Sequence, residues 1–125
     1  MILLLDAHAL VWWLCDDRQL SVSARAAIAD AGNDIVVSAA TVWELAIKRS
    51  AGKIELAADL ASAIDAAGFS GLPVTIADAE AAAGLPMLHH DPFDRMLVAQ
   101  AFRLDATIVS RDAALEPYGV PVLPA

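Results

Sequence analysis

The sequence is short of cysteine, of long apolar runs and of basic side chains, and each shortage excludes a class of protein. Cys15 is the single cysteine, so an internal disulfide cannot form and no cysteine-based metal site is expected. The opening apolar run stops at Asp6, far short of the roughly 20 residues that a membrane span needs. We therefore expect a cytoplasmic protein without a signal peptide or a membrane anchor.

The shortage of positive charge limits how this chain contacts nucleic acid. Eight Lys and Arg residues stand against sixteen Asp and Glu residues, which gives a net charge of -8. Broad, sequence-independent adhesion to nucleic acid depends on many cations that neutralise phosphates, so any such contact must be local here. Six of these eight cations form two groups along the chain: Lys48, Arg49 and Lys53, and then Arg95, Arg103 and Arg111 near acidic motifs.

Short apolar runs alternate along the chain with longer alanine-rich segments. The runs predict strands at residues 2–5, 35–37, 72–75, 107–109 and 120–123. Helices are predicted at residues 10–15, 22–31, 39–51, 59–67 and 76–83, and from just after Pro92 to about residue 105. Strands that are apolar throughout and separated by helices predict one domain over residues 1–125, a three-layer α/β/α sandwich with a mostly parallel sheet.

Acidic residues follow two of the predicted strands. Asp6 comes directly after the first strand, and Asp112 follows the fourth by way of Ser110 and Arg111. In open parallel sheets, ligands collect beyond the carboxyl ends of the strands, where both aspartates are expected. Each aspartate alone is also well explained as a turn or cap residue, since Asp commonly opens a helix after a short loop.

Two further carboxylates occupy apolar helical surroundings. Glu44 is surrounded by Val42, Trp43 and Leu45, and its simplest alternative role is an ion pair with Lys48 one turn later.

Asp91 is predicted to be the cap of the helix that starts at Pro92. Asp94 differs from it, because Leu97 and Val98 continue its face of the helix as an apolar stripe. An uncompensated charge on that face would cost several kcal/mol or raise the pKa of the carboxyl.

Four acids that converge on one end of one sheet with few cations nearby indicate a divalent metal site. The expected ligands are Asp6, Glu44, Asp94 and Asp112. Oxygen ligands select hard ions such as Mg²⁺ or Mn²⁺, which support phosphodiester hydrolysis. In this hypothesis the four acids are also the catalytic residues, Ser110 supplies a supporting hydroxyl, and Arg95 and Arg111 bind flanking phosphates. The three histidines, His8, His89 and His90, lack a zinc pattern, so core or loop roles are expected for them.

The chain resembles the PIN-domain ribonucleases and, among them, the VapC-type toxins of bacterial toxin-antitoxin pairs. The resemblance runs along the whole chain and rests on Leu4–His8, on Val42–Leu45 within Ser38–Lys48, on His90–Ala101 and on Ser110–Asp112. Its most specific part is Asp-Pro-Phe-Asp-Arg at residues 91–95.

The resemblance implies a parallel α/β sandwich and a Mg²⁺- or Mn²⁺-dependent endoribonuclease, with the four acids named above at the acidic positions of the family. It also implies a homodimer and a cognate antitoxin that silences the enzyme. Trp12 and Trp13 are neighbours on one helix and cannot both point into the core, so one of them is expected either in a groove that an antitoxin helix could use or over a loop of the domain itself.

Two other interpretations fit parts of the pattern. A phosphoacceptor receiver domain has the same size and layers, but it needs an acceptor Asp at the end of its middle strand and a Lys at the end of a later one. Here the corresponding strands lead to Ser38 and to Ser110-Arg111, which disfavours that class. The second is a catalytically silent interaction module whose acidic pocket binds a basic partner.

Overall fold

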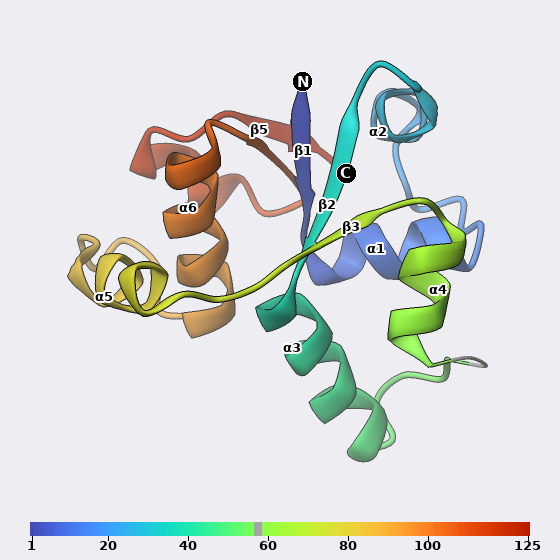
Figure 1. The fold of residues 1–125 in the computed structure, drawn as a ribbon, viewed down its shortest axis with the longest axis horizontal. Coiled ribbons are helices and arrows are strands. Elements are labelled where there is room, and N and C mark those ends of the chain that lie inside the picture. Colours follow the sequence, from blue (N-terminus) through green and yellow to red (C-terminus); the bar gives the residue numbers. More distant parts are fainter. Residues whose placement is uncertain (57–58) are drawn as a thin grey trace.

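A computed structural model describes residues 1–56 and 59–125 as strands that alternate with helices (Figure 1). The strands are β1 (Ile2–Leu5), β2 (Asp34–Ser38), β3 (Ser70–Leu72), β4 (Thr107–Ser110) and β5 (Val122–Pro124). The helices are α1 (Ala7–Leu14), α2 (Val22–Ala29), α3 (Ala39–Ser50), α4 (Leu60–Ala66), α5 (Ile76–Gly84) and α6 (Pro92–Leu104), with a 3₁₀ helix η1 (Ala113–Tyr118). Within these described ranges, no helix combines the length and the apolar character needed to cross a bilayer.

The five strands form one parallel sheet in the order β3-β2-β1-β4-β5. After β1 the chain builds the sheet outward through β2 and β3, and then returns to the other side of β1 with β4. The order reverses between β1 and β4, which places a crevice beyond the carboxyl ends of these two strands. A receiver domain has the order 2-1-3-4-5, so the topology excludes that interpretation.

Helices cover both faces of the sheet, as the sequence predicts. Figure 1 shows α1, α2 and α4 on one side of the strands and α5 and α6 on the other. The alternating side chains of β1 serve both layers, since Leu3 and Leu5 pack in the cluster with α1, α2 and α4, whereas Leu4 packs against α6. Burial on both faces explains why the central strand β1 is apolar throughout, whereas β3 at the edge of the sheet is mostly exposed.

Three elements differ most from the prediction, and the others agree with it to within about two residues. α1 begins at Ala7 instead of residue 10, because Asp6 caps it by accepting a hydrogen bond from the Ala9 N–H at 2.8 Å. β3 ends at Leu72, where residues 72–75 were expected to be a strand; Pro73 follows and has no N–H to donate to the ladder. The last strand is residues 122–124 rather than 120–123, and the 3₁₀ helix before it was not predicted.

The paired tryptophans at residues 12 and 13 both cover the domain itself. Trp12 is 7% exposed and its ring lies 5.6 Å from that of His8, while the Trp13 ring lies 6.1 Å from that of Phe69. The interface role expected for one of them is therefore not supported. The exposed tryptophan is Trp43, which is 64% exposed.

Candidate active site

The first acid stands at the point where the strand order reverses. Asp6 follows β1 and is 5% exposed, and its N–H donates to the Val109 carbonyl of β4 at 3.1 Å. Burial raises the pKa of the Asp6 carboxyl above its ordinary value, although the Ala9 N–H and the Ser110 hydroxyl oppose the rise. Ser110 is buried at the end of β4 and also accepts a hydrogen bond from the Asp112 N–H at 3.0 Å.

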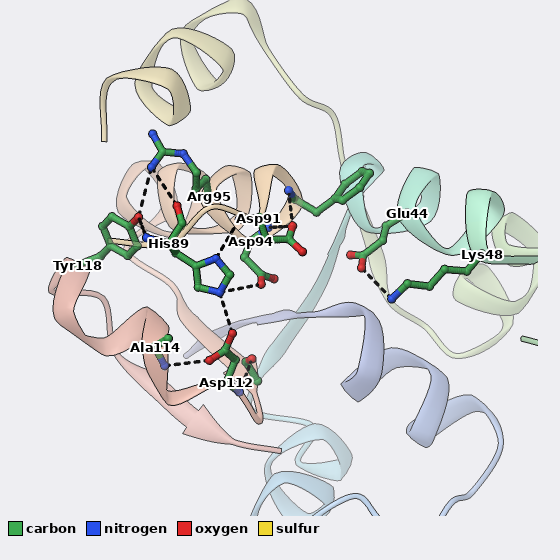
Figure 2. Close-up of polar contacts among 11 residues, drawn as sticks. Glu44, Lys48, His89, Asp91, Asp94, Arg95, Asp112, Ala114 and Tyr118 are labelled. Atoms are coloured by element: carbon green, nitrogen blue, oxygen red, sulfur yellow. Dashed lines mark hydrogen bonds and ion pairs between the residues drawn. The ribbon is translucent and has the colours of Figure 1, made fainter. Parts of the chain in front are cut away.

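Two more acids meet at the imidazole of His89 (Figure 2). Asp112 Oδ2 lies 2.8 Å from His89 Nε2, and Asp94 Oδ2 lies 3.4 Å from the same nitrogen. Asp112 is also the cap of η1, because its Oδ1 accepts from the Ala114 N–H at 2.9 Å. These hydrogen bonds, first that from His89, lower the pKa of the Asp112 carboxyl.

The fourth acid comes from the opposite wall of the same cleft. Glu44 on α3 is largely buried, with 14% of its side chain exposed, and its Oε2 forms an ion pair with Lys48 Nζ at 3.0 Å. The ion pair that the sequence offers for Glu44 is therefore present, and metal binding by this residue stays a prediction. The cleft has a volume of about 450 Å³ and is lined by Asp6, Ala7, His8, Glu44, Lys48, His89, Asp91, Asp94, Arg111 and Asp112.

A separate hollow of about 570 Å³ lies between α3, α4 and the β3 edge, and its lining is mostly apolar. None of the four acids is among the residues that line this hollow, so we place the candidate site in the polar cleft.

Negative charge is poorly compensated in the cleft. Burial first, and then the negative charges of Asp91, Asp6 and Glu44, raise the pKa of the Asp94 carboxyl to about 7, although the nearby His89 lowers it. His8 gives little help, because burial lowers the pKa of its imidazole. The apolar stripe next to Asp94 thus has the electrostatic effect that the sequence predicts.

The donor chemistry fits a hard divalent cation. The atoms of His89, Asp94 and Asp112 that can bind a metal all lie within 4.8 Å of one another, and no other such group of three is found in the ranges that the structure describes. Asp6 and Glu44 line the same cleft without belonging to this closest group. Carboxylate oxygens that are buried and short of cations are typical ligands of Mg²⁺ and Mn²⁺.

Arg95 has a different role from the phosphate contact expected of it. It is 7% exposed, and its guanidinium donates to the carbonyls of Ala82, Leu85 and Pro86 at 2.8 to 3.0 Å. It donates more weakly to the His89 carbonyl at 3.3 Å. These contacts hold the loop between α5 and α6, so the prediction that Arg95 binds phosphate is wrong.

Arg111 remains suited to that contact. It is exposed, lines the cleft, and its guanidinium lies 5.5 Å from the centre of the Trp12 ring. The ring supports the flat guanidinium while its donors stay accessible at the rim. Binding of phosphate by Arg111 stays a prediction.

Asp91 is the helix cap that the sequence predicts, and its removal should affect stability first. Its Oδ1 accepts from the N–H groups of Phe93 and Asp94 at 2.8 and 3.2 Å. We expect Asp91→Ala to lower the free energy of unfolding by about 0.5 to 2 kcal/mol and to leave Mn²⁺ binding largely intact. Urea unfolding and a Mn²⁺ titration measure the two effects, with Asp91→Asn as the control that keeps a capping oxygen. Complete loss of Mn²⁺ binding would show that Asp91 belongs to the metal site.

Comparisons with known proteins agree with this fold. The family model for the PIN domain matches residues 3–120. The chain is 31% identical over 121 residues to ribonuclease VapC22 of Mycobacterium tuberculosis, and these residues cover 94% of this chain and 92% of that protein.

Solved structures of similar fold include a chain of VapBC2 from Rickettsia felis bound to a promoter DNA fragment, with a TM-score of 0.73 and 15% identity over 99% of this chain and 98% of that one. A chain of VapBC-1 from nontypeable Haemophilus influenzae has a TM-score of 0.63 and 16% identity over the same shares. The match to the family model and the 31% identity establish the family, and the low-identity structures support the fold. This chain, with its five parallel strands and its acidic cleft at the β1–β4 crevice, belongs to the PIN-domain family and to its VapC group.

Proposed function

We propose that this protein is a Mg²⁺- or Mn²⁺-dependent endoribonuclease and the toxin of a toxin-antitoxin pair. One observation carries the proposal: the four predicted carboxylates come from distant segments and line, together with Asp91, a single polar cleft beyond the carboxyl ends of β1 and β4. The 31% identical relative is itself named a ribonuclease, which supports the same reaction for this chain.

The residues of the cleft divide the work. Asp6, Glu44, Asp94 and Asp112 would hold the cation directly or through water. A bound cation of this kind lowers the pKa of water and stabilises negative charge on a phosphate and on its leaving oxygen.

Side chains around the acids prepare the cleft for RNA. The Ser110 hydroxyl forms hydrogen bonds with the Asp6 carboxyl and with the Asp112 N–H. Arg111 at the rim binds a phosphate next to the bond that is cut, which gives local attraction to RNA despite the negative net charge. Lys48 keeps Glu44 in place through their ion pair.

A silent interaction module is the less favoured alternative. A pocket that only binds a basic partner needs exposed negative charge, whereas Asp6 is 5% exposed. Burial raises the pKa of the Asp94 carboxyl to about 7, so without a bound cation this acid carries only about half of its charge at pH 7. Burial of this kind is typical of a site that works on a bound ion.

We also propose that residues 1–125 form one domain, that the protein is a cytoplasmic homodimer, and that an antitoxin is its partner. The fold relatives named VapBC2 and VapBC-1 support the antitoxin. The other three proposals rest on the family and on the composition, in particular the single free Cys15.

The purified full chain tests the activity directly. We expect it to cleave RNA in Mn²⁺ or Mg²⁺ and to lose cleavage when the metal is chelated and regain it when the metal is returned. Structured and unstructured RNA are compared in the same assay to define the substrate. Cleavage that persists unchanged in chelator would refute the metal-dependent mechanism.

A further inference from the structure

His89 lies in the loop between α5 and α6, and hydrogen bonds of its own backbone fix its position. The His89 N–H donates to Tyr118 Oη at 2.9 Å, and the His89 carbonyl accepts from the Arg95 guanidinium at 3.3 Å. Tyr118 Oη in turn donates to the Pro86 carbonyl at 2.9 Å, and Arg95 is nearly buried beneath the loop. The position of the imidazole is therefore set by contacts with α6 and η1 (Figure 2).

The imidazole itself is fixed in one tautomer. The Asp91 N–H donates to His89 Nδ1 at 3.0 Å. A backbone N–H can only donate, so Nδ1 must offer a lone pair and carries no proton. The ring proton then lies on Nε2, which faces Asp112 Oδ2 at 2.8 Å and Asp94 Oδ2 at 3.4 Å.

We propose that His89 is a positioning residue, which donates its Nε2–H to Asp112 and does not bind the metal itself. The inference rests on the proposed function in that the acids it orients are the proposed metal ligands. In this proposal all the protein atoms that bind the metal are carboxylate oxygens. His89 Nε2 lies close enough to Asp94 and Asp112 to bind the same ion, but it donates a hydrogen bond instead.

Metal binding through Nε2 would disturb the start of α6. To bind a metal, Nε2 would have to lose its proton, and the neutral imidazole would then carry its proton on Nδ1. The Nδ1–H would then oppose the Asp91 N–H, two donors facing each other at 3.0 Å. Asp91 is the cap of α6, so the change would affect the turn that carries Asp94.

Donation from Nε2 has a specific effect on Asp112. Its two carboxylate oxygens have separate donors, Ala114 N–H for Oδ1 and His89 Nε2–H for Oδ2. The carboxylate is thereby held in one rotamer, with its remaining lone pairs available to the cleft. Loss of the His89 donor would leave Oδ2 free to rotate away from Asp94.

The tautomer is measured in the metal-free wild-type chain by long-range ¹H–¹⁵N NMR of its histidine rings. We expect His89 to carry its proton on Nε2 and none on Nδ1; a proton on Nδ1 would overturn the inference. This measurement needs no enzymatic activity, so it judges His89 separately from the proposed nuclease.

Pulsed EPR with bound Mn²⁺ then tests for nitrogen at the metal. We expect no ¹⁴N coupling that depends on His89. A coupling present in the wild type and lost in His89→Gln would overturn the inference even if the chain cleaves RNA. Absence of metal-dependent cleavage by the wild type would instead refute the nuclease proposal.

Two substitutions separate donation from the mere presence of a ring. His89→Gln places an N–H donor near the position of Nε2, whereas His89→Asn carries its amide at shorter reach. We expect His89→Asn to lower kcat for RNA by about 10- to 100-fold with little change in KM, and His89→Gln to recover most of that loss. His90→Gln, one residue away and exposed, is the matched control. Equal losses in the Gln and Asn variants, with both folded by circular dichroism, would reject the donor role.

Discussion

Replacing Asp94 with Asn is expected to abolish metal-dependent RNA cleavage while the fold persists. Asp94 lies in the cleft with 20% of its side chain exposed, and Asn keeps its size but removes the negative charge that attracts a cation. The loss should exceed the roughly 100-fold that is typical when a residue behind a metal ligand is changed. Cleavage rates and Mn²⁺ titrations of the two proteins measure it.

The same substitution should stabilise the metal-free protein above neutral pH. Burial raises the pKa of the Asp94 carboxyl to about 7 from an ordinary value of 3.8. Between these pH values the folded chain holds a proton that the unfolded chain has released, so wild-type stability falls as pH rises towards 7. At pH 8 in chelator, Asp94→Asn should therefore be more stable by up to about 4 kcal/mol, because the folded chain must release a proton that it holds about three pH units more tightly than the unfolded chain, and by pH 4 most of the difference should be gone.

A second acid on the same helix provides the control. Asp105 ends α6 in the left-handed conformation, which Asn also adopts readily, so Asp105→Asn should change neither cleavage nor the pH dependence of melting. In cells, induction of the wild-type chain should arrest growth, and induction of the Asp94 variant should not. Cleavage at the wild-type rate by Asp94→Asn would remove Asp94 from the mechanism.

The sequence predicts the fold and the members of the cleft for a physical reason. Parallel strands end at one edge of a sheet, so Asp6 and Asp112 can be placed together before any coordinates are known. Asp94 can be recognised because a charge interrupts an apolar helix face, and the raised pKa of its carboxyl agrees with that interpretation. Glu44 follows from the same reasoning on α3.

The contacts of the loop before α6 could not be predicted in this way. Arg95 donates to backbone carbonyls, which every residue possesses, so the sequence contains no sign of its partners. His89 contacts Asp112 across 23 residues, and that contact depends on the loop that Arg95 holds. From the sequence, only a core or loop role is expected for His89.

Removing the Asp78 carboxylate should cause the largest loss of stability. Asp78 on α5 is 2% exposed and accepts from Arg103 Nε and Nη2 at 2.6 and 2.9 Å, from Gln100 at 3.2 Å and from the Thr75 N–H at 3.1 Å. Asp78→Ala removes an acceptor shared by α5 and α6 and breaks the capping box of α5. We expect unfolding to become easier by about 3 kcal/mol, the lower part of the range for a broken buried ion pair, because Arg103 can return to water.

The pH dependence of the free energy of unfolding should report the same interaction. The Arg103 hydrogen bonds lower the pKa of the Asp78 carboxyl, so its contribution is present above the ordinary pKa of 3.8 and is lost as pH falls further. The difference in unfolding free energy between wild type and Asp78→Asn should therefore be larger at pH 7 than at pH 3. Glu80→Ala, exposed on the same helix, should stay within about 0.5 kcal/mol of wild type. Asp94 lies on α6, so a folded Asp78 variant that cleaves RNA normally at low temperature would show that the Asp78–Arg103 ion pair stabilises the domain without shaping the cleft. A decrease of less than about 1 kcal/mol in the free energy of unfolding of Asp78→Ala would contradict the stabilising role of this ion pair.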